Sequence, residues 1–192
     1  MLSKFSPTRT GFDFDGVIAD TVEAFLRIAC EDHGYCGFRA EDITNFCVEE
    51  CISIPQNVLS SIFHYLTEKP VEAGLLPMAG ALQALKRLSY FGTVVIVTAR
   101  PKADPVVNWL THVGGHTFST GIEVVAVGDH DDKERFIRQT GLSSFIDDRA
   151  ETCADLRKKG IDARVFTQPW NQMRQDLPRV GSWEEICQLC LS

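Results

Sequence analysis

The stretch TGFDFDGVIADT, residues 10–21, places two acids, Asp13 and Asp15, in a turn that is otherwise apolar. Their neighbours Phe12 and Phe14 are residues that belong in a hydrophobic core. Burying an ionised carboxylate without compensation is costly in free energy. The turn therefore predicts a site in which the acids are paired, bind a metal or are neutralised.

Short apolar runs alternate with helical patterns in the rest of the chain. The runs after the acidic turn are TVVIVTAR, IEVVAV, SSFIDD and ARVFT, and amphipathic segments such as DPVVNWLTHVGG and AETCADLRKKG separate them. Strands that alternate with helices form right-handed βαβ units and a parallel sheet covered on both faces. We expect such an α/β sheet, with TRTGF as its first strand.

The region between the acidic turn and the second strand has a different pattern. TVEAFLRIACEDHG predicts a helix that leaves the turn and is capped at Gly34, and PQNVLSSIFHYLTEK predicts a second helix that starts at Pro55. KPVEAGLLPMAG, rich in proline and glycine, then suggests a hinge or boundary. These features predict a helical insertion.

Polar residues follow the predicted strands at their carboxyl ends, where parallel α/β sheets bind ligands. Each of these residues alone is weak evidence, because aspartate and glycine are common after strands for turn formation. Their repetition at strand ends is the signal. They are Asp13 and Asp15, Thr98 and Arg100, Gly128 and Asp129, and Asp147 and Asp148.

Carboxylates that converge on one crevice repel each other, by about 4 kcal/mol for a pair about 4 Å apart at an effective dielectric near 20. A cation must therefore lie among them. Oxygen ligands without clustered histidine or cysteine favour a hard ion, and Mg²⁺ suits a site with few carboxylates and room for water and phosphate. Lys133, at the start of a predicted helix, offers a second positive charge.

This set of groups fits phosphoryl transfer. The hydroxyl of Thr98, the ammonium of Lys133 and a metal can bind a phosphoryl dianion. Asp13 can attack phosphorus to form an acyl phosphate that water then hydrolyses. Asp15 can protonate the leaving oxygen and then deprotonate the water.

The quoted segments DFDGV, VIVTAR, the lysine at 133 and FIDDR resemble, in order, the four motifs of the haloacid dehalogenase-like (HAD) phosphohydrolase superfamily. The resemblance implies Asp13 as nucleophile, Asp15 as acid/base, and Thr98 and Lys133 as phosphate ligands. It also implies Mg²⁺ held by Asp13, the backbone carbonyl of Asp15 and a motif-four acid: Asp147, supported by Asp148.

The resemblance extends to the organisation of the chain. The superfamily has a Rossmann-like core, expected here at residues 1–19 and 77–192, and a small helical cap between the first two motifs, expected at residues 20–76. FIDDR followed by ARVFTQPWNQ and RVGSWEEI is most similar to the 5′(3′)-deoxyribonucleotidase-like group, which dephosphorylates nucleoside monophosphates. A magnesium-dependent nucleotidase is therefore the expected function.

Composition limits the other classes. The 192 residues carry 26 acids against 19 bases, a net charge of −7, which disfavours binding of a nucleic-acid polymer. No apolar stretch is long enough for a membrane span or signal peptide, so we expect a cytoplasmic enzyme with a small phosphorylated substrate. Its oligomeric state is open.

The seven cysteines, scattered and odd in number, predict no complete disulfide framework, and we expect most to be small buried hydrophobic residues. The CxxC pair in SWEEICQLC is interpreted as packing of a terminal helix. Zinc binding by Cys47 and Cys51 with Cys36 and His33 is disfavoured, because the spacing matches no standard pattern.

Several alternatives stay open. The substrate could be a sugar phosphate, or the protein a phosphomutase that returns the phosphoryl group to its product. A non-catalytic phosphate- or partner-binding domain could keep the same fold. Arg100 and Arg149 could orient substrate or pair with acids, and neither is placed in the core site. The aromatic residues of the insertion, which could stack on a nucleobase, are interpreted as core: Phe25, Phe38, Phe46, Phe63 and Tyr65.

Overall fold

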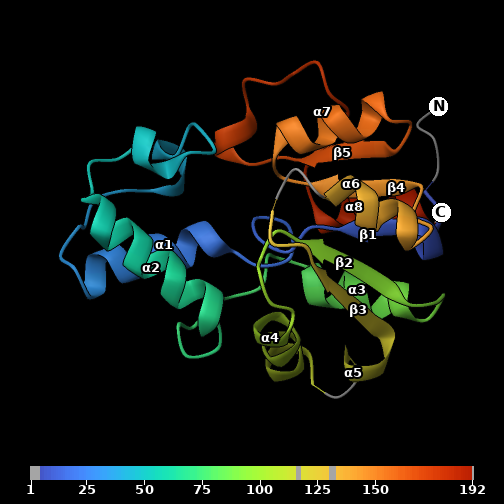
Figure 1. The fold of residues 1–192 in the computed structure, drawn as a ribbon, viewed down its shortest axis with the longest axis horizontal. Coiled ribbons are helices and arrows are strands. Elements are labelled where there is room, and N and C mark those ends of the chain that lie inside the picture. Colours follow the sequence, from blue (N-terminus) through green and yellow to red (C-terminus); the bar gives the residue numbers. More distant parts are fainter. Residues whose placement is uncertain (1–4, 116–117, 130–132, 192) are drawn as a thin grey trace.

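A parallel β-sheet forms the centre of the computed structural model, which describes residues 5–115, 118–129 and 133–191. Its strand order is β3-β2-β1-β4-β5-β6, and all neighbouring strands are parallel. β1 lies between β2 and β4, so the acidic turn that follows β1 leaves the middle of the sheet (Figure 1). The strands are β1 (Thr10–Phe12), β2 (Val94–Thr98), β3 (Ile122–Ala126), β4 (Ser144–Asp147), β5 (Asp162–Phe166) and β6 (Arg179–Val180).

Residues along the central strands alternate between the two faces of the sheet, as side chains of a strand must. In β2, Val94 and Ile96 join one hydrophobic cluster, whereas Val95 and Val97 join the other. Apolar residues on both faces explain why the run VVIVT is continuously hydrophobic. The α/β class predicted from the sequence is confirmed.

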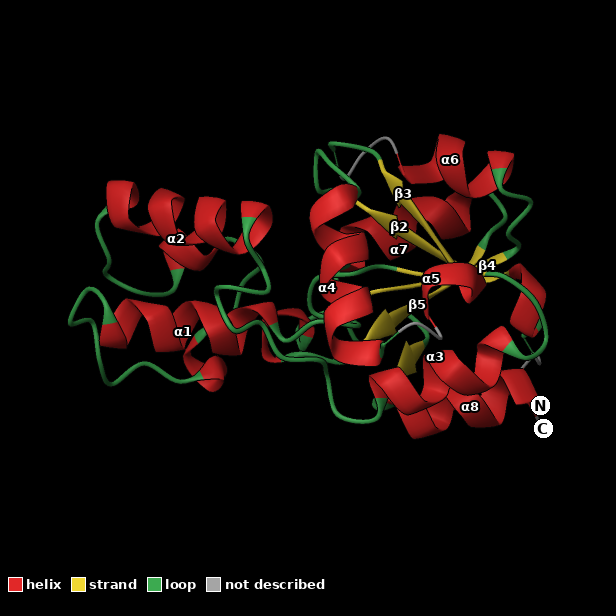
Figure 2. Ribbon diagram, turned by 90° about the horizontal axis from the view of Figure 1, so that it is seen from below, coloured by secondary structure: helices red, strands yellow, loops and turns green. Residues whose placement is uncertain are grey.

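Helices cover both faces (Figure 2). The face with Val95 and Val97 packs against α6 (Lys133–Gln139) and α7 (Ala150–Lys158), through residues such as Ile137 and Leu156. The opposite face packs against a group that includes a pair of contacting helices, α3 and α8. This group is α3 (Ala81–Ser89), α4 (Asp104–Gly114), α5 (Phe118–Gly121) and α8 (Trp183–Leu191).

Two further helices, α1 (Thr21–Glu31) and α2 (Gln56–Glu68), pack against each other to one side of the sheet (Figures 1 and 2). The rings of Phe25 and Phe63 stack between them, with centroids 4.8 Å apart. Pro55 precedes α2, as predicted, whereas α1 ends at Glu31, ahead of the expected cap at Gly34. The 3₁₀ turns of the chain are Pro7–Arg9, Ala40–Asp42, Val48–Glu50 and Pro169–Asn171.

The chain leaves the sheet for α1 and returns after α2 along two adjacent segments. The Asp20 amide donates to the Leu76 carbonyl at 2.9 Å, and the Met78 amide donates to the Ile18 carbonyl at 2.8 Å. These bonds join the segments on either side of residues 20–76. The division into a core (1–19 and 77–192) and a cap stays a prediction, and residues 1–4, 116–117, 130–132 and 192 lie outside the described part of the chain.

The prediction that most cysteines are buried is wrong, because two of the seven form a disulfide and two more are exposed or half-buried. Cys30 at the end of α1 forms a disulfide with Cys36, across 4.3 Å between their Cα atoms. The bond closes a short local loop, which odd and scattered cysteines do not reveal, and it removes Cys36 from any zinc site. Fewer cysteines are buried than expected: Cys153, Cys187 and Cys190 are buried, but Cys47 is exposed and Cys51 is half-buried.

Hydrogen bonds of Ser182 and Glu185 cap the start of the last helix. The Glu185 amide donates to the Ser182 hydroxyl at 3.2 Å, while the Glu185 carboxylate accepts from the Gly181 amide at 2.7 Å. Cys187 and Cys190 pack into the core, as expected for a terminal helix. Across the described ranges, none of the helices has the length and apolar character that crossing a membrane requires.

Candidate active site

The turn after β1 is held by its own backbone. The Phe14 carbonyl accepts from the amides of Ile18 and Ala19, and the Gly16 amide donates to the Ala19 carbonyl, all at 2.9 Å. Gly16 has φ 69°, a left-handed conformation, and a Cβ there would lie 2.2 Å from a carboxylate oxygen of Asp148. The DFDG sequence therefore needs its glycine to let the turn approach the next acidic strand end.

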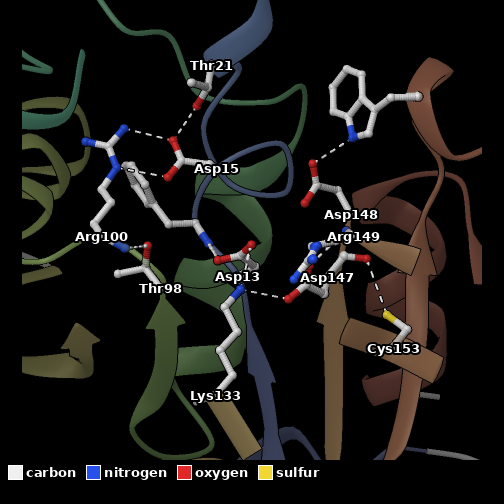
Figure 3. A network of polar contacts seen from close by, with 12 residues as sticks. Asp13, Asp15, Thr21, Thr98, Arg100, Lys133, Asp147, Asp148, Arg149 and Cys153 are labelled. Atoms are coloured by element: carbon white, nitrogen blue, oxygen red, sulfur yellow. Dashed lines mark hydrogen bonds and ion pairs between the residues drawn. The ribbon is translucent and has the colours of Figure 1, made fainter. Parts of the chain in front are cut away.

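Asp13 and Asp147 share one buried ammonium (Figure 3). Lys133 Nζ lies 2.8 Å from Asp13 Oδ2 and 2.8 Å from Asp147 Oδ2, and its side chain is 1% exposed. Burial alone would lower the pKa of Lys133, but the two carboxylates outweigh it and raise that pKa. Lys133 is therefore a fixed positive charge between the ends of β1 and β4.

Burial raises the pKa of Asp13 to about 7, although the charge of Lys133 opposes the rise. The Phe14 amide donates to Asp13 Oδ1 at 2.7 Å, which fixes the orientation of the carboxyl group. The pKa of Asp148 is raised well above its usual range by burial, and the charges of Asp147 and Asp13 add to the rise. The raised pKa values show that negative charge is unfavourable on these buried carboxyl groups, and a bound cation would stabilise their ionised forms.

Asp13, Asp147 and Asp148 can each direct a carboxylate oxygen to one point, since those oxygens lie within 4.8 Å of one another. All three residues are buried, and the donors are oxygens alone. This donor chemistry fits a hard divalent cation. Among the described residues this is the one group of such side chains with that geometry. Asp15, predicted as a further metal residue through its backbone carbonyl, is not part of this carboxylate group.

The segment Gln168–Asn171 holds the third acid in place. The Trp170 indole donates to Asp148 Oδ2 at 2.9 Å, and Asn171 Nδ2 donates to the Asp148 carbonyl at 2.7 Å. Gln168 Nε2 donates to the Gly16 carbonyl at 2.6 Å, which joins this segment to the first acidic turn. In the sequence analysis, the segment with these residues supported the resemblance to the deoxyribonucleotidase-like group. The sequence did not predict that their side chains contact the acidic turn and Asp148.

Asp15 turns toward a different partner. Its carboxylate forms a bidentate ion pair with Arg100, at 2.9 Å from Nε and 2.8 Å from Nη2, and accepts from the Thr21 hydroxyl at 2.5 Å (Figure 3). Burial would raise the pKa of Asp15, but Arg100 and Thr21 outweigh it and lower that pKa. Of the two alternatives left open for Arg100, the structure shows the pairing with an acid, Asp15, which lies 85 positions away in the sequence.

Thr98, predicted as a phosphate ligand, ends β2 beside β1 and is fully buried. Its hydroxyl accepts from the Arg100 amide at 3.2 Å. Asp129 follows β3 and is exposed. Arg149 has its guanidinium 5.4 Å from the ring centre of Phe46, and its amide donates to Asp147 Oδ1 at 2.8 Å.

A cavity of about 430 Å³ lies over these strand ends, between the sheet and the α1–α2 pair. The acids Asp13, Asp15 and Asp148 lie on its wall together with Arg100. Most of the remaining lining is apolar and comes from residues 22–66, including Phe46 and Phe63. The cavity therefore has a charged floor, formed by Asp13, Asp15, Asp148 and Arg100, and above it an apolar chamber lined by residues such as Phe46 and Phe63. This arrangement suits a small ligand with one anionic end.

The sequence was compared with models of known protein families and with curated proteins. The sequence profile of the family described as 5′ nucleotidase, deoxy (pyrimidine), cytosolic type C protein (NT5C) matches residues 8–192. No curated protein matches the chain.

Solved structures share the fold at low sequence identity. A haloacid dehalogenase-like hydrolase from Streptococcus pneumoniae aligns at a TM-score of 0.62 with 16% identity, covering 98% of this chain and 99% of that one. A HAD-superfamily hydrolase from Geobacter sulfurreducens aligns at 0.58 with 14% identity, covering 94% of each chain. The protein named protein tyrosine kinase A from Mycobacterium tuberculosis aligns at 0.60 with 18% identity, covering 95% and 97%. These likenesses establish the fold alone, because function depends on the site.

Proposed function

The chain belongs to the deoxy (pyrimidine) cytosolic type C 5′ nucleotidase family of HAD-type phosphatases, and from this premise we propose that it hydrolyses nucleoside monophosphates through an aspartyl phosphate on Asp13. The observation that carries the proposal is the buried contact of Lys133 Nζ with both Asp13, which lines the cavity, and Asp147, which is buried beside it. A buried cation beside a candidate nucleophile suits the binding of a phosphoryl group.

The proposed reaction has two steps. An Asp13 carboxylate oxygen attacks phosphorus and the bond from phosphorus to the ester oxygen breaks, while Asp15, which must enter this step in its protonated form, gives its proton to the departing alkoxide. A water molecule then attacks the phosphorus of the aspartyl phosphate, and Asp15 takes the proton of that water. Inorganic phosphate leaves and the Asp13 carboxylate is restored. Thr98 and Lys133 bind the phosphoryl oxygens in both steps.

Mg²⁺ is the proposed cofactor, because Asp13, Asp147 and Asp148 supply buried oxygen donors within reach of one another. The backbone carbonyl of Asp15 completes the proposed protein ligand set. When bound, the ion neutralises negative charge on the carboxylates and on the phosphoryl group. Asp148 is kept in orientation for this role by Trp170 and Asn171.

The apolar chamber above the acids is the proposed site of the nucleoside. Its lining by Phe46, Phe63 and Trp170 offers flat surfaces to a base, while the phosphate lies against the charged floor. The name of the family points to pyrimidine deoxynucleotides. These substrates therefore head the series to be tested.

The test is phosphate release from deoxynucleoside and ribonucleoside monophosphates, sugar phosphates and p-nitrophenyl phosphate, with Mg²⁺ and with EDTA. We expect release from nucleotides that EDTA abolishes and that the Asp13→Asn variant lacks while remaining folded by circular dichroism. Faster release from a sugar phosphate would replace the proposed substrate. Activity retained by Asp13→Asn would exclude Asp13 as the nucleophile.

A further inference from the structure

Arg100 is the most extensively paired side chain beside the candidate acid/base. It follows β2 by two residues, is 6% exposed, and directs Nε and Nη2 to the two oxygens of Asp15 (Figure 3). A guanidinium that meets a carboxylate with two parallel hydrogen bonds fixes its plane as well as its position. The ring of Phe14 lies 4.8 Å from the guanidinium carbon and packs against the same group.

The third nitrogen of the guanidinium, Nη1, contacts the end of α2. Arg100 Nη1 donates to the carbonyls of Leu66 at 2.9 Å and Thr67 at 3.2 Å, in the last turn of α2. Carbonyls in a last helical turn have no partner within their own helix, so they are available as acceptors. One side chain thus joins the acidic turn of the sheet to the end of α2.

We infer that Arg100 is a positioning residue, which fixes the Asp15 carboxylate at the cavity and ties its orientation to the end of α2. The inference rests on the proposed function, since it assigns Arg100 a role in the proton transfers of Asp15. The fork shape of the guanidinium contributes to this role, because a lysine ammonium keeps the charge but cannot span two carboxylate oxygens and two carbonyls in one plane.

Asp15 needs such support because its surroundings are open. Its side chain is 36% exposed and it lines the cavity, whereas the side chain of Asp13 is 5% exposed. A carboxylate at a cavity wall can adopt several rotamers, and proton transfer requires one that reaches the ester oxygen within hydrogen-bond distance. Arg100 from one side and Thr21 from another restrict Asp15 to a single orientation.

The role has a consequence that depends on the leaving group. An alkoxide leaving a nucleoside monophosphate must be protonated, so its departure depends on a correctly placed Asp15. The p-nitrophenolate ion is stable at neutral pH and leaves without a proton. Loss of a group that positions the acid should therefore slow formation of the aspartyl phosphate from a nucleoside monophosphate. It should leave the rate of the same step from p-nitrophenyl phosphate nearly unchanged.

The experiment compares kcat/KM for a deoxynucleoside monophosphate and for p-nitrophenyl phosphate in the wild type, Arg100→Ala and Arg100→Lys, all with Mg²⁺. We expect Arg100→Ala to lower kcat/KM for the nucleotide by about tenfold or more, as for impaired acid/base help, and to change that for p-nitrophenyl phosphate by less than about threefold. Arg100→Lys should show the same selectivity with a smaller loss.

Lys102→Ala is the matched control, since Lys102 in the same loop pairs with Glu68 at the end of α2 but has a 62% exposed side chain. It should leave both values near those of the wild type.

If Arg100→Ala folds poorly, the comparison is decided by Arg100→Lys. Equal losses for both esters in either folded variant, or none, would overturn the inference while leaving the proposed function intact. If the wild type cleaves neither ester, the proposed function fails first.

Discussion

Replacing Lys133 by methionine tests whether the buried ammonium stabilises the acidic floor. The variant keeps most of the side-chain volume and removes the charge that lies 2.8 Å from both Asp13 and Asp147. Their oxygens lie within 4.8 Å, so two charged carboxylates would repel by about 3.5 kcal/mol or more at an effective dielectric near 20. Breaking buried ion pairs typically costs about 3–5 kcal/mol.

Protonation limits this cost. Because the pKa of Asp13 is about 7, its carboxyl group is mostly ionised at about pH 7.5 and mostly neutral at about pH 5.5, so the repulsion is weaker at the lower pH. We therefore expect Lys133→Met to lower the free energy of unfolding by about 3–5 kcal/mol at the higher pH in EDTA, and by less at the lower pH. Mg²⁺ should recover more stability in the variant than in the wild type, because the ion supplies the missing positive charge.

The assay is urea denaturation followed by circular dichroism, at both pH values, with EDTA or Mg²⁺. Lys102→Met is the control, because Lys102 forms an ion pair of the same 2.8 Å length with Glu68 at the surface. Exposed pairs contribute about 0–1 kcal/mol. A Lys133→Met loss no larger than that of the control would refute the reasoning that burial makes this ammonium essential.

Four further predictions concern the same floor. Gly16→Ala should cost at least the roughly 1–2 kcal/mol of a left-handed alanine and should also displace Asp148, so denaturation and phosphatase assays should both show losses; unchanged activity would contradict the close approach. Trp170→Phe removes a hydrogen bond to the buried carboxyl group of Asp148 and should lower the free energy of unfolding in urea by about 1.5–3 kcal/mol. If Asp148 loses its orientation, calorimetry should also show weaker Mg²⁺ binding. Asp15→Asn should lower nucleotide turnover by about 10²- to 10⁴-fold, and a milder loss would mean that water or another group transfers the proton. In EDTA, the folded state retains a proton on Asp13 up to a pKa of about 7 that the unfolded chain releases near pH 3.8. Asp13 should therefore make stability fall as pH rises between these values, by at most about 1.4 kcal/mol per pH unit, and Asp13→Asn should lose this part of the slope.

Much of the sheet was predictable because its signals are local. The run VVIVT is continuously apolar and short, and its residues face the two hydrophobic clusters alternately. Parallel strands bring their carboxyl ends to one edge, so the acids at residues 13 and 147 were expected to meet. Their contacts with Lys133 at 2.8 Å agree with that expectation of proximity, while their catalytic roles stay predictions.

The contacts that were missed depend on segments far apart in the sequence. Arg100 meets Asp15 and the end of α2 only when the sheet and the helical pair are both in place. Gln168 reaches the Gly16 carbonyl only after the turn beyond β5 folds back over the first strand end. β6, with two residues, is too short to carry a periodic signal.

The hydrogen bond from Gln168 to Gly16 joins residues 152 positions apart, with consequences for synthesis on the ribosome. A nascent chain presents its first acidic turn early, but the strand that carries Asp147 and the segment that orients Asp148 emerge much later. Closing so long a loop is slow compared with forming local helices. The chain should therefore acquire affinity for the cation only near the end of translation. In ribosome-bound chains of increasing length, cation binding would show when the acidic residues have come together.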